Sequence, residues 1–354
     1  MAACFSAVQR EFSAAVSSSS ESSFSMNVMP SPRDILKPLP LRRGDTVGIV
    51  APASNIQRES LDAGVVQLRK LGYGVVLGDS VYERDLYFAG SAEARARDLH
   101  RMFERDDVRA ILCARGGYGS NYLLPLLDLD LIRRHPKILI GYSDPTSLLT
   151  WIYDETGLVT FHGPMAAKDF AHDDGVDLDS WFAALEGSGE LKVSSRVFAG
   201  LKTIVPGEAN GILYGGCLSL LAASLGTPYE VETGGTILFL EDIGTKPYQV
   251  DRMLMQMKYA GALEGVKGMV FGEMLDCAQP GGQDYTLEKV IERVLASLEV
   301  PIAYGLPSGH VRKNNVTLPI GVPARLQANQ NAVTLTWLEP AVGVSPVRAT
   351  GTLM

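Results

Sequence analysis

One serine of this chain stands where a hydroxyl nucleophile could be presented. Ser143 follows an apolar run at residues 137–140, typical of a buried strand, and precedes residues 145–149, typical of the first turn of a helix. Such a strand-to-helix turn pushes the hydroxyl out of the sheet and turns nearby backbone N–H groups toward it, as a nucleophile elbow requires. A plain helix N-cap explains the same spacing, so both interpretations stay open.

A serine nucleophile needs a base, and histidine is the usual one. Among the five histidines of the sequence, three lie in charged or polar segments and are expected to be solvated: His100, His135 and His172. His162 follows a predicted buried strand at the same sheet edge as Ser143, so it could be the base or only line a pocket. His310, in the segment 307–310, would need a cleft between domains to reach Ser143. These observations leave the two candidates even.

The third group should be a carboxylate that orients the imidazole. Glu241 and Asp242 end the apolar strand predicted at 237–240, a place where charge is unusual unless it is used or paired. Because adjacent strand residues point to opposite faces, only one of them can face a given site. Alternatively, both carboxylates simply cap the loop before Gly244.

A glycine-rich segment, Arg115-Gly116-Gly117-Tyr118-Gly119, could aim backbone N–H groups at an anion. A dinucleotide fingerprint fails here, because the position three after Gly119 is Tyr122. An oxyanion hole fits better, since it needs only a closely approaching backbone, although a tight turn without function is an equal alternative. No HExxH, clustered Asp/His or paired Cys spacing occurs, so we expect neither a metal nor another cofactor.

The elements that would position these groups alternate strand and helix over residues 41–165, which predicts an α/β domain with a parallel, Rossmann-like sheet covered on both faces. The expected strands are 46–51, 74–77, 110–113, 137–140 and 158–161, and the expected helices are 61–71, 92–105, 122–127 and 145–155. Ligands of such sheets bind beyond the carboxyl ends of the strands. Four polar or glycine-rich clusters fall there: 52–55, 115–119, 143–144 and 162–164.

The rest of the chain divides by composition. Residues 166–206 are acidic and rich in small residues, with one helical stretch near 181–185, and are interpreted as a linker that could act as a flap. Residues 207–345 are predicted to form a smaller β-rich domain. Residues 1–40 carry a Ser-rich low-complexity stretch and are expected to be disordered, as a transit peptide or as an extension before a start near Met26 or Met29.

Composition excludes several classes of protein. The chain has 354 residues, is 46% hydrophobic and has a formal charge of −8. It has no uninterrupted apolar run of about 18 residues, so we expect a soluble protein without a membrane partner. Nucleic acid is not expected either, because clustered Lys and Arg are missing. The four cysteines are scattered, which favours a reducing, cytoplasmic compartment, with Cys113 as a core residue.

Taken in order along the chain, several segments resemble the LD-carboxypeptidase family of serine peptidases, which includes murein tetrapeptide carboxypeptidases and microcin C immunity peptidases. The matching segments are 44–52, 115–119, 141–144, 162–165, 215–219, 240–242 and 309–310. The resemblance implies an α/β N-terminal domain, a β-rich C-terminal domain, an active site in the cleft between them and, usually, a homodimer.

The resemblance also implies roles for individual residues. Ser143 would be the nucleophile, His310 the base and Glu241 the orienting acid, and the backbone N–H groups of Gly117 and Asp144 would form the oxyanion hole. One position departs from the family: where its members usually have Asn in a Gly-Gly-Asn-Leu-Ser segment, this chain has Cys217. A thiol hydrogen-bonds only weakly, so we expect activity to survive while substrate contacts near this residue differ.

The expected function is therefore a serine carboxypeptidase that releases D-Ala from murein tetrapeptide during cell-wall recycling. Arg115 is a candidate for holding the substrate carboxylate, with a structural ion pair as the alternative, and His162 and Cys217 are further candidate substrate contacts. One rival is an amidase that acts on a peptidyl-nucleotide antibiotic with the same triad and stacks the base on Trp181. The other is a non-catalytic module that captures muropeptides.

Overall fold

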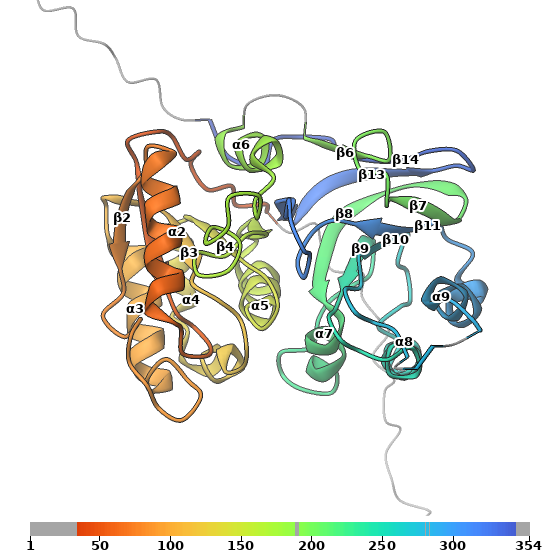
Figure 1. Ribbon diagram of the computed structural model, residues 1–354, viewed down its shortest axis with the longest axis horizontal. Helices are drawn as coiled ribbons and strands as arrows, with labels where there is room; N and C mark the ends of the chain where they lie inside the picture. The colour runs from red at the N-terminus through yellow and green to blue at the C-terminus, as the bar shows by residue number, and fades with distance from the viewer. Residues whose placement is uncertain (1–33, 188–190, 280, 283, 345–354) are drawn as a thin grey trace, which may run out of the picture. The chain divides into compact units, whose positions relative to one another are not determined.

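The computed structural model describes residues 34–187, 191–279, 281–282 and 284–344. The described residues between Ile35 and residue 344 form one compact unit (Figure 1). Most of the predicted leader lies outside the described residues. The expectation of disorder is wrong for its last part, residues 34–40, which the structure places. The N–H of Leu36 donates to the carbonyl of Gly157 at 2.9 Å, and the carbonyl of Leu36 accepts from Val159 at 2.9 Å. These residues are tied to the first sheet's connections.

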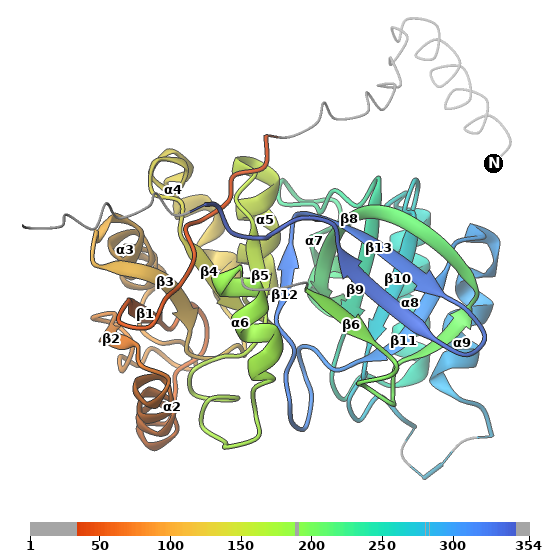
Figure 2. The same ribbon diagram turned by 90° about the horizontal axis from the view of Figure 1, so that it is seen from above.

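The first sheet has six strands in the order β12-β5-β4-β3-β1-β2, as Figure 2 shows. Its strands are β1 (Thr46–Val50), β2 (Gly74–Leu77), β3 (Val108–Cys113), β4 (Ile138–Gly141), β5 (Thr160–His162) and β12 (Leu318–Ile320). β1 to β5 pair in parallel, and β12 pairs antiparallel to β5 at the edge. The predicted parallel sheet is confirmed, with one strand added from the far end of the chain.

Helices cover both faces of this sheet, because side chains alternate along each buried strand. The helices are α2 (Arg58–Lys70), α3 (Ala92–Glu104), α4 (Leu129–Arg134) and α5 (Thr146–Thr156). Apolar residues of α3, α4 and α5 cluster with Ile111 and Leu139, whereas those of α2 cluster with Leu112 and Ile140. The helix expected at 122–127 is wrong: two short 3₁₀ turns stand there, since Pro125 lacks the N–H that a helix interior uses.

The second sheet is mixed and has eight strands in the order β6-β14-β13-β8-β9-β10-β11-β7. Its strands are β6 (Lys192–Ser194), β7 (Lys202–Val205), β8 (Gly207–Cys217), β9 (Thr236–Glu241), β10 (Gly268–Gly272), β11 (Ile302–Leu306), β13 (Val322–Ala328) and β14 (Val333–Trp337). β8 to β11 run parallel to one another and the outer strands antiparallel. Beside this sheet lie α7 (Leu218–Ser224), α8 (Pro247–Tyr259) and α9 (Leu287–Leu295) (Figure 1). An α/β fold with a β-rich second part is confirmed.

The segment expected to be a linker or flap is built into the structure. Its helix α6 (Leu178–Glu186) buries Trp181 completely, and the indole N–H donates to the hydroxyl of Tyr73 at 3.3 Å. Farther along, β6 and β7 are strands of the second sheet. The buried Trp181 makes α6 a packing element, and a flap role for residues 166–206 stays a prediction. The division at 41–165 and 207–345 stays a prediction.

Within the described ranges, the structure has no helix of the length and apolar character that crossing a bilayer demands.

Candidate active site

Ser143 lies on a strained turn between β4 and α5. Its φ is +64°, in the left-handed region that non-glycine residues avoid, at a cost of about 1–3 kcal/mol. The N-cap of α5 is Pro145, and no side chain caps this helix. The alternative that Ser143 serves as an N-cap therefore fails. Strand, strained turn and helix together form the elbow geometry that the sequence predicted.

Backbone from the glycine-rich loop lies directly against this serine. A Cβ on Gly116 would stand 2.8 Å from the Ser143 Cβ and 2.9 Å from its Oγ, so only glycine fits there. Gly117 has φ +104°, which also favours glycine. Among the described residues, the N–H groups of Gly117 and Asp144 have no hydrogen-bond acceptor. Two donors beside the serine are thus available to an anion.

Glu241 and His310 form a buried pair. Glu241 ends β9 and is 1% exposed, and its Oε2 accepts from the His310 Nδ1–H at 2.7 Å and from the His310 main-chain N–H at 2.9 Å. A carboxylate only accepts hydrogen bonds, so Nδ1 carries the proton and Nε2 has a free lone pair. Gly309, at φ +89°, allows this approach, because a Cβ there would meet the Glu241 Cδ at 2.5 Å.

The two members of this pair shift each other's pKa in opposite directions. Burial, the largest single influence, lowers the pKa of His310, but the charge of Glu241 and the hydrogen bond to it outweigh burial, and the pKa is raised. For Glu241, burial raises the pKa, and the charge and hydrogen bonds of His310 outweigh it, so that the pKa is lowered. The imidazolium is therefore stabilised wherever His310 accepts a proton.

One pocket of about 490 Å³ joins the serine to the histidine. Ser143, His310, Arg115, Gly116 and Gly117 all line it. The ring of Tyr142 stands edge-on to His310, with centroids 5.1 Å apart and planes at 87°. The cleft that His310 would need is present.

Asp242, the other carboxylate at the end of β9, faces away from the histidine. Its Oδ2 accepts from the Ser219 N–H at 2.9 Å, and its Oδ1 accepts from Ile243 N–H at 2.8 Å and Thr245 Oγ1 at 3.0 Å. Opposite faces for the two neighbours agree with strand geometry. Asp242 caps loops, and Glu241 alone meets His310.

His162 does not reach the pocket. It is fully buried, neither ring nitrogen has a hydrogen-bond partner among the described residues, and its ring packs 5.0 Å from that of Phe239. Burial lowers its pKa to about 4, so the ring is neutral near pH 7. The expectation that His100 is solvated is wrong. This residue is half-buried, and its ring accepts a hydrogen bond from the Asp128 N–H at 3.0 Å. Burial lowers its pKa as well.

Arg115 and Cys217 take different positions around the site. Arg115 is exposed, lines the pocket and donates to the Asn55 carbonyl at 3.2 Å. It makes no ion pair with any described residue, so the structural alternative for it is not supported. Cys217 ends β8 and is 3% exposed, and its Sγ lies 3.3 Å from Ser219 Oγ. Its Sγ lies within 4.8 Å of a Glu241 carboxylate oxygen and a His310 ring nitrogen, and Cys217 is not among the residues that line the pocket.

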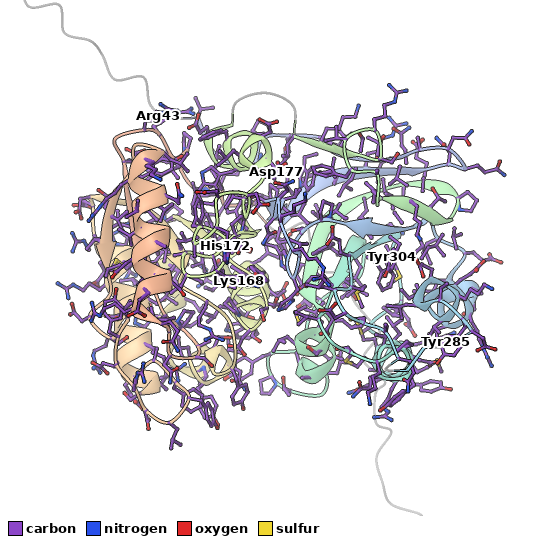
Figure 3. The ribbon with its side chains drawn as sticks, viewed as in Figure 1. Arg43, Lys168, His172, Asp177, Tyr285 and Tyr304 are labelled. Atoms are coloured by element: carbon purple, nitrogen blue, oxygen red, sulfur yellow. The ribbon has the colours of Figure 1, made fainter. Side chains whose placement is uncertain are left out.

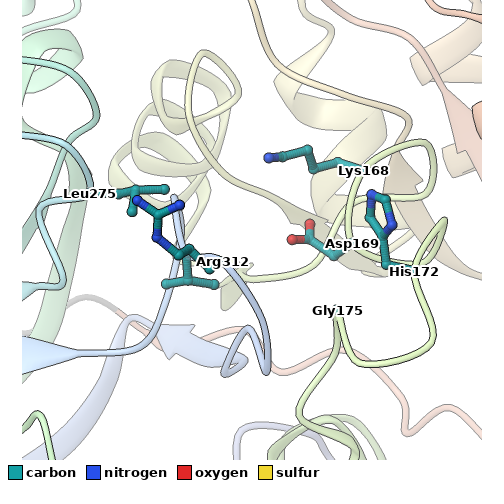
Figure 4. Close-up of a pocket in the computed structure, with 7 residues that line it drawn as sticks. Lys168, Asp169, His172, Gly175, Leu275 and Arg312 are labelled. Atoms are coloured by element: carbon teal, nitrogen blue, oxygen red, sulfur yellow. The ribbon is translucent and has the colours of Figure 1, made fainter.

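Sequence reasoning gave Lys168 no role, and it expected His172 to be solvated, which its exposure confirms. Lys168 and His172, from the loop after β5, lie close together in Figure 3, and with Asp169 and Arg312 they line a second pocket of about 300 Å³ (Figure 4). Lys168 lines both pockets. Asp169 is buried and accepts from the Met165 N–H at 2.8 Å and the Asn315 side chain at 3.2 Å, and burial raises its pKa to about 6. The one sequence signal was a Lys-Asp pair soon after the predicted cluster at 162–164.

Comparison with known proteins gives consistent matches. Residues 47–163 match the LD-carboxypeptidase N-terminal domain, and residues 210–326 match the LD-carboxypeptidase C-terminal domain. A probable murein peptide carboxypeptidase of Bacillus subtilis is 41% identical over 84% of this chain and 93% of its own length. A murein tetrapeptide carboxypeptidase of Pseudomonas aeruginosa is 34% identical over 80% and 94%. The structure of MccF in complex with glutamyl sulfamoyl guanosine superposes with a TM-score of 0.79 at 27% identity, over 87% and 100%.

The fold combines a parallel sheet, which carries Ser143 on a strand-to-helix turn, with a second, mixed sheet. Together with these matches, it defines a serine hydrolase. The chain belongs to the LD-carboxypeptidase family, Peptidase S66, over both of its characteristic domains.

Proposed function

We propose that this chain is a serine LD-carboxypeptidase that removes D-Ala from the end of murein tetrapeptide. The observation that carries the proposal is that Ser143 and the Glu241-bound His310 line one pocket. The names of the Bacillus and Pseudomonas relatives support the substrate class. A role in cell-wall recycling, a cytoplasmic site of action and a homodimer belong to the same proposal.

In the proposed mechanism, the Ser143 hydroxyl gives its proton to the free Nε2 of His310 while Oγ attacks the scissile carbonyl. Glu241 holds Nδ1–H and stabilises the imidazolium. The oxyanion accepts hydrogen bonds from the N–H groups of Gly117 and Asp144, and each such donor typically contributes about 2.7–4 kcal/mol. His310 then protonates the leaving amine of D-Ala, and water, with His310 as base, hydrolyses the acyl-enzyme.

An exopeptidase must also recognise the free carboxylate of its substrate. Arg115 and Lys168 are the cationic side chains that line the serine pocket. Arg115 has a guanidinium suited to bidentate carboxylate binding, and Lys168 also borders the second pocket. We propose that the two share this task, one holding the terminal carboxylate and the other an acidic group farther along the peptide.

The test is mass-spectrometric detection of D-Ala released from a defined tetrapeptide. The Ser143→Ala variant should fold normally and release none. Ser147→Ala is the matched control, because this serine lies on α5, outside the pocket, and should leave release unchanged. Near-normal release by Ser143→Ala would reject the mechanism.

The amidase alternative keeps a specific argument, the likeness to MccF bound to a sulfamoyl nucleoside. It loses the aromatic partner that the sequence suggested, because Trp181 is fully buried. Competition between tetrapeptide and an aspartyl sulfamoyl adenosine decides between them: hydrolysis of the second in preference to the first would favour the amidase. Labelling of Ser143 by a fluorophosphonate would count against a non-catalytic module.

A further inference from the structure

We infer that Cys217, Glu241 and His310 form a binding site for a thiophilic divalent cation such as Zn²⁺, and that an ion bound there switches the enzyme off. The inhibitory part of this inference rests on the proposed function. The binding part does not, since it concerns only the three side chains.

The fold brings these residues together from separate segments. Cys217 and Glu241 are register partners at the ends of the parallel strands β8 and β9, so their side chains project side by side. His310 arrives from the loop after β11. One ligand atom from each, the Cys217 Sγ, a Glu241 carboxylate oxygen and a His310 ring nitrogen, lie within 4.8 Å of one another. Sequence spacing could not predict this site, because the fold creates it.

The buried carboxylate has capacity left for a ligand. Glu241 is 1% exposed, and its Oε1 has no hydrogen-bond partner among the described residues. A buried polar atom left in this state costs free energy, and a cation would satisfy it. The Cys217 thiol is a free thiol with Ser219 Oγ at 3.3 Å and a hydrogen bond from the Leu220 backbone, and neither contact uses its capacity to bind a soft cation. One carboxylate oxygen of Glu241 is therefore open to a ligand in the free protein.

The donor set selects the kind of ion. Thiolate, imidazole and carboxylate are the three ligand types that Zn²⁺ uses, whereas Mg²⁺ and Ca²⁺ prefer oxygen alone. Ligand atoms of a tetrahedral zinc site lie roughly 3.3–3.7 Å apart. The observed cluster, whose ligand atoms lie within 4.8 Å of one another, must therefore close by up to about 1.5 Å around an ion. Water would take the fourth position.

An ion bound to these three residues would prevent His310 from acting as the base in the proposed mechanism. The ion replaces the proton on His310 Nδ1 and binds the Glu241 carboxylate and the Cys217 thiolate. The Nδ1 proton moves to Nε2, so the imidazole stays neutral, and the Cys217 thiol proton is released to solvent. His310 then no longer accepts the Ser143 proton. An Asn at position 217, the residue that the family usually has, would offer no soft ligand. The Cys makes this chain sensitive where such relatives are not.

The first experiment measures binding without turnover. Co²⁺ replaces Zn²⁺ in the full chain carrying Ser143→Ala, and a thiolate-to-cobalt charge-transfer absorption is recorded, followed by competition with Zn²⁺. The absorption should appear, persist with Cys277→Ser as the matched control, and vanish with Cys217→Ser. Loss of the ligand should weaken Zn²⁺ binding about 100-fold. No absorption, or absorption that survives Cys217→Ser, would overturn the site.

The second experiment measures inhibition of D-Ala release. Zn²⁺ should inhibit, a chelator should restore activity, Mg²⁺ should have no effect, and Cys217→Asn should raise the half-inhibitory Zn²⁺ concentration about 100-fold. This ratio is taken within each variant, so a change in basal rate does not matter. Binding by cobalt without inhibition would overturn the regulatory half. A chain that never releases D-Ala would fail the proposed function, while the cobalt experiment would still decide the site.

Discussion

Replacing Glu241 by Gln tests the buried pair most directly. The Gln oxygen can still accept from both N–H groups of His310, so the tautomer is kept while the charge is lost. With a 2.7 Å contact between Oε2 and Nδ1, the charge centres are about 4 Å apart, which corresponds to about 4 kcal/mol at an effective dielectric constant of about 20. That energy predicts a fall in kcat of about a thousandfold.

The same variant should move the pH profile in a defined direction. Burial lowers the pKa of His310, and the charge of Glu241 is the main influence that raises it. Without that charge the pKa falls. Since the base must be neutral, activity is lost as pH falls through this pKa, and the acid limb should move to lower pH. The assay is D-Ala release against pH for both proteins.

Asp242→Asn is the matched control for this experiment, because the neighbouring carboxylate caps loops and makes no contact with the imidazole. It should lower kcat by less than about tenfold. A loss below tenfold in Glu241→Gln, or an acid limb that stays in place or moves to higher pH, would refute the argument from charge.

Three further predictions follow from packing. Gly116→Ala places a Cβ 2.8 Å from the Ser143 Cβ and should therefore displace the nucleophile and lower kcat at least about 100-fold. The measurement is D-Ala release. An unaffected rate would contradict the close contact between Gly116 and Ser143. Burial lowers the pKa of His162 in the folded chain to about 4. As the pH falls, this histidine therefore takes up a proton in the unfolded chain before it does so in the folded chain. Stability should fall from about pH 6.5 to 4, and less so in His162→Leu, as followed by urea unfolding; an equal fall would place this titration elsewhere. Trp181→Phe breaks the hydrogen bond to Tyr73 and should lower the free energy of unfolding by about 1–3 kcal/mol. KM for the tetrapeptide should stay unchanged. A changed KM would favour the interpretation of this segment as a flap over the substrate.

Local pattern was sufficient for the first sheet. The runs that became β1, β3 and β4 are apolar and continuous because both faces of each strand are buried, and such runs stand out in any sequence. The turn at Ser143 could also be predicted from the sequence, because a strand and a helix meet there within a few residues. By contrast, short elements such as α4 and β6 have too few residues to show a period.

The site was harder to predict, because its parts are far apart in the chain. Residue types alone left His162 and His310 even, since nothing local says which ring meets a carboxylate. The resemblance to a family favoured His310, and the structure pairs that ring with Glu241. The ion cluster around Cys217 could not be predicted, because it depends on the register of β8 against β9.

The edge strand β12 ties the order of synthesis to completion of the first sheet. Its residues, Leu318–Ile320, cover the open side of β5, which itself pairs with the strand that leads into Ser143. A growing chain therefore carries an uncovered β edge beside its nucleophile until nearly its whole length has left the ribosome. During that interval the exposed backbone can pair with other chains, and a prematurely terminated protein would keep this edge permanently.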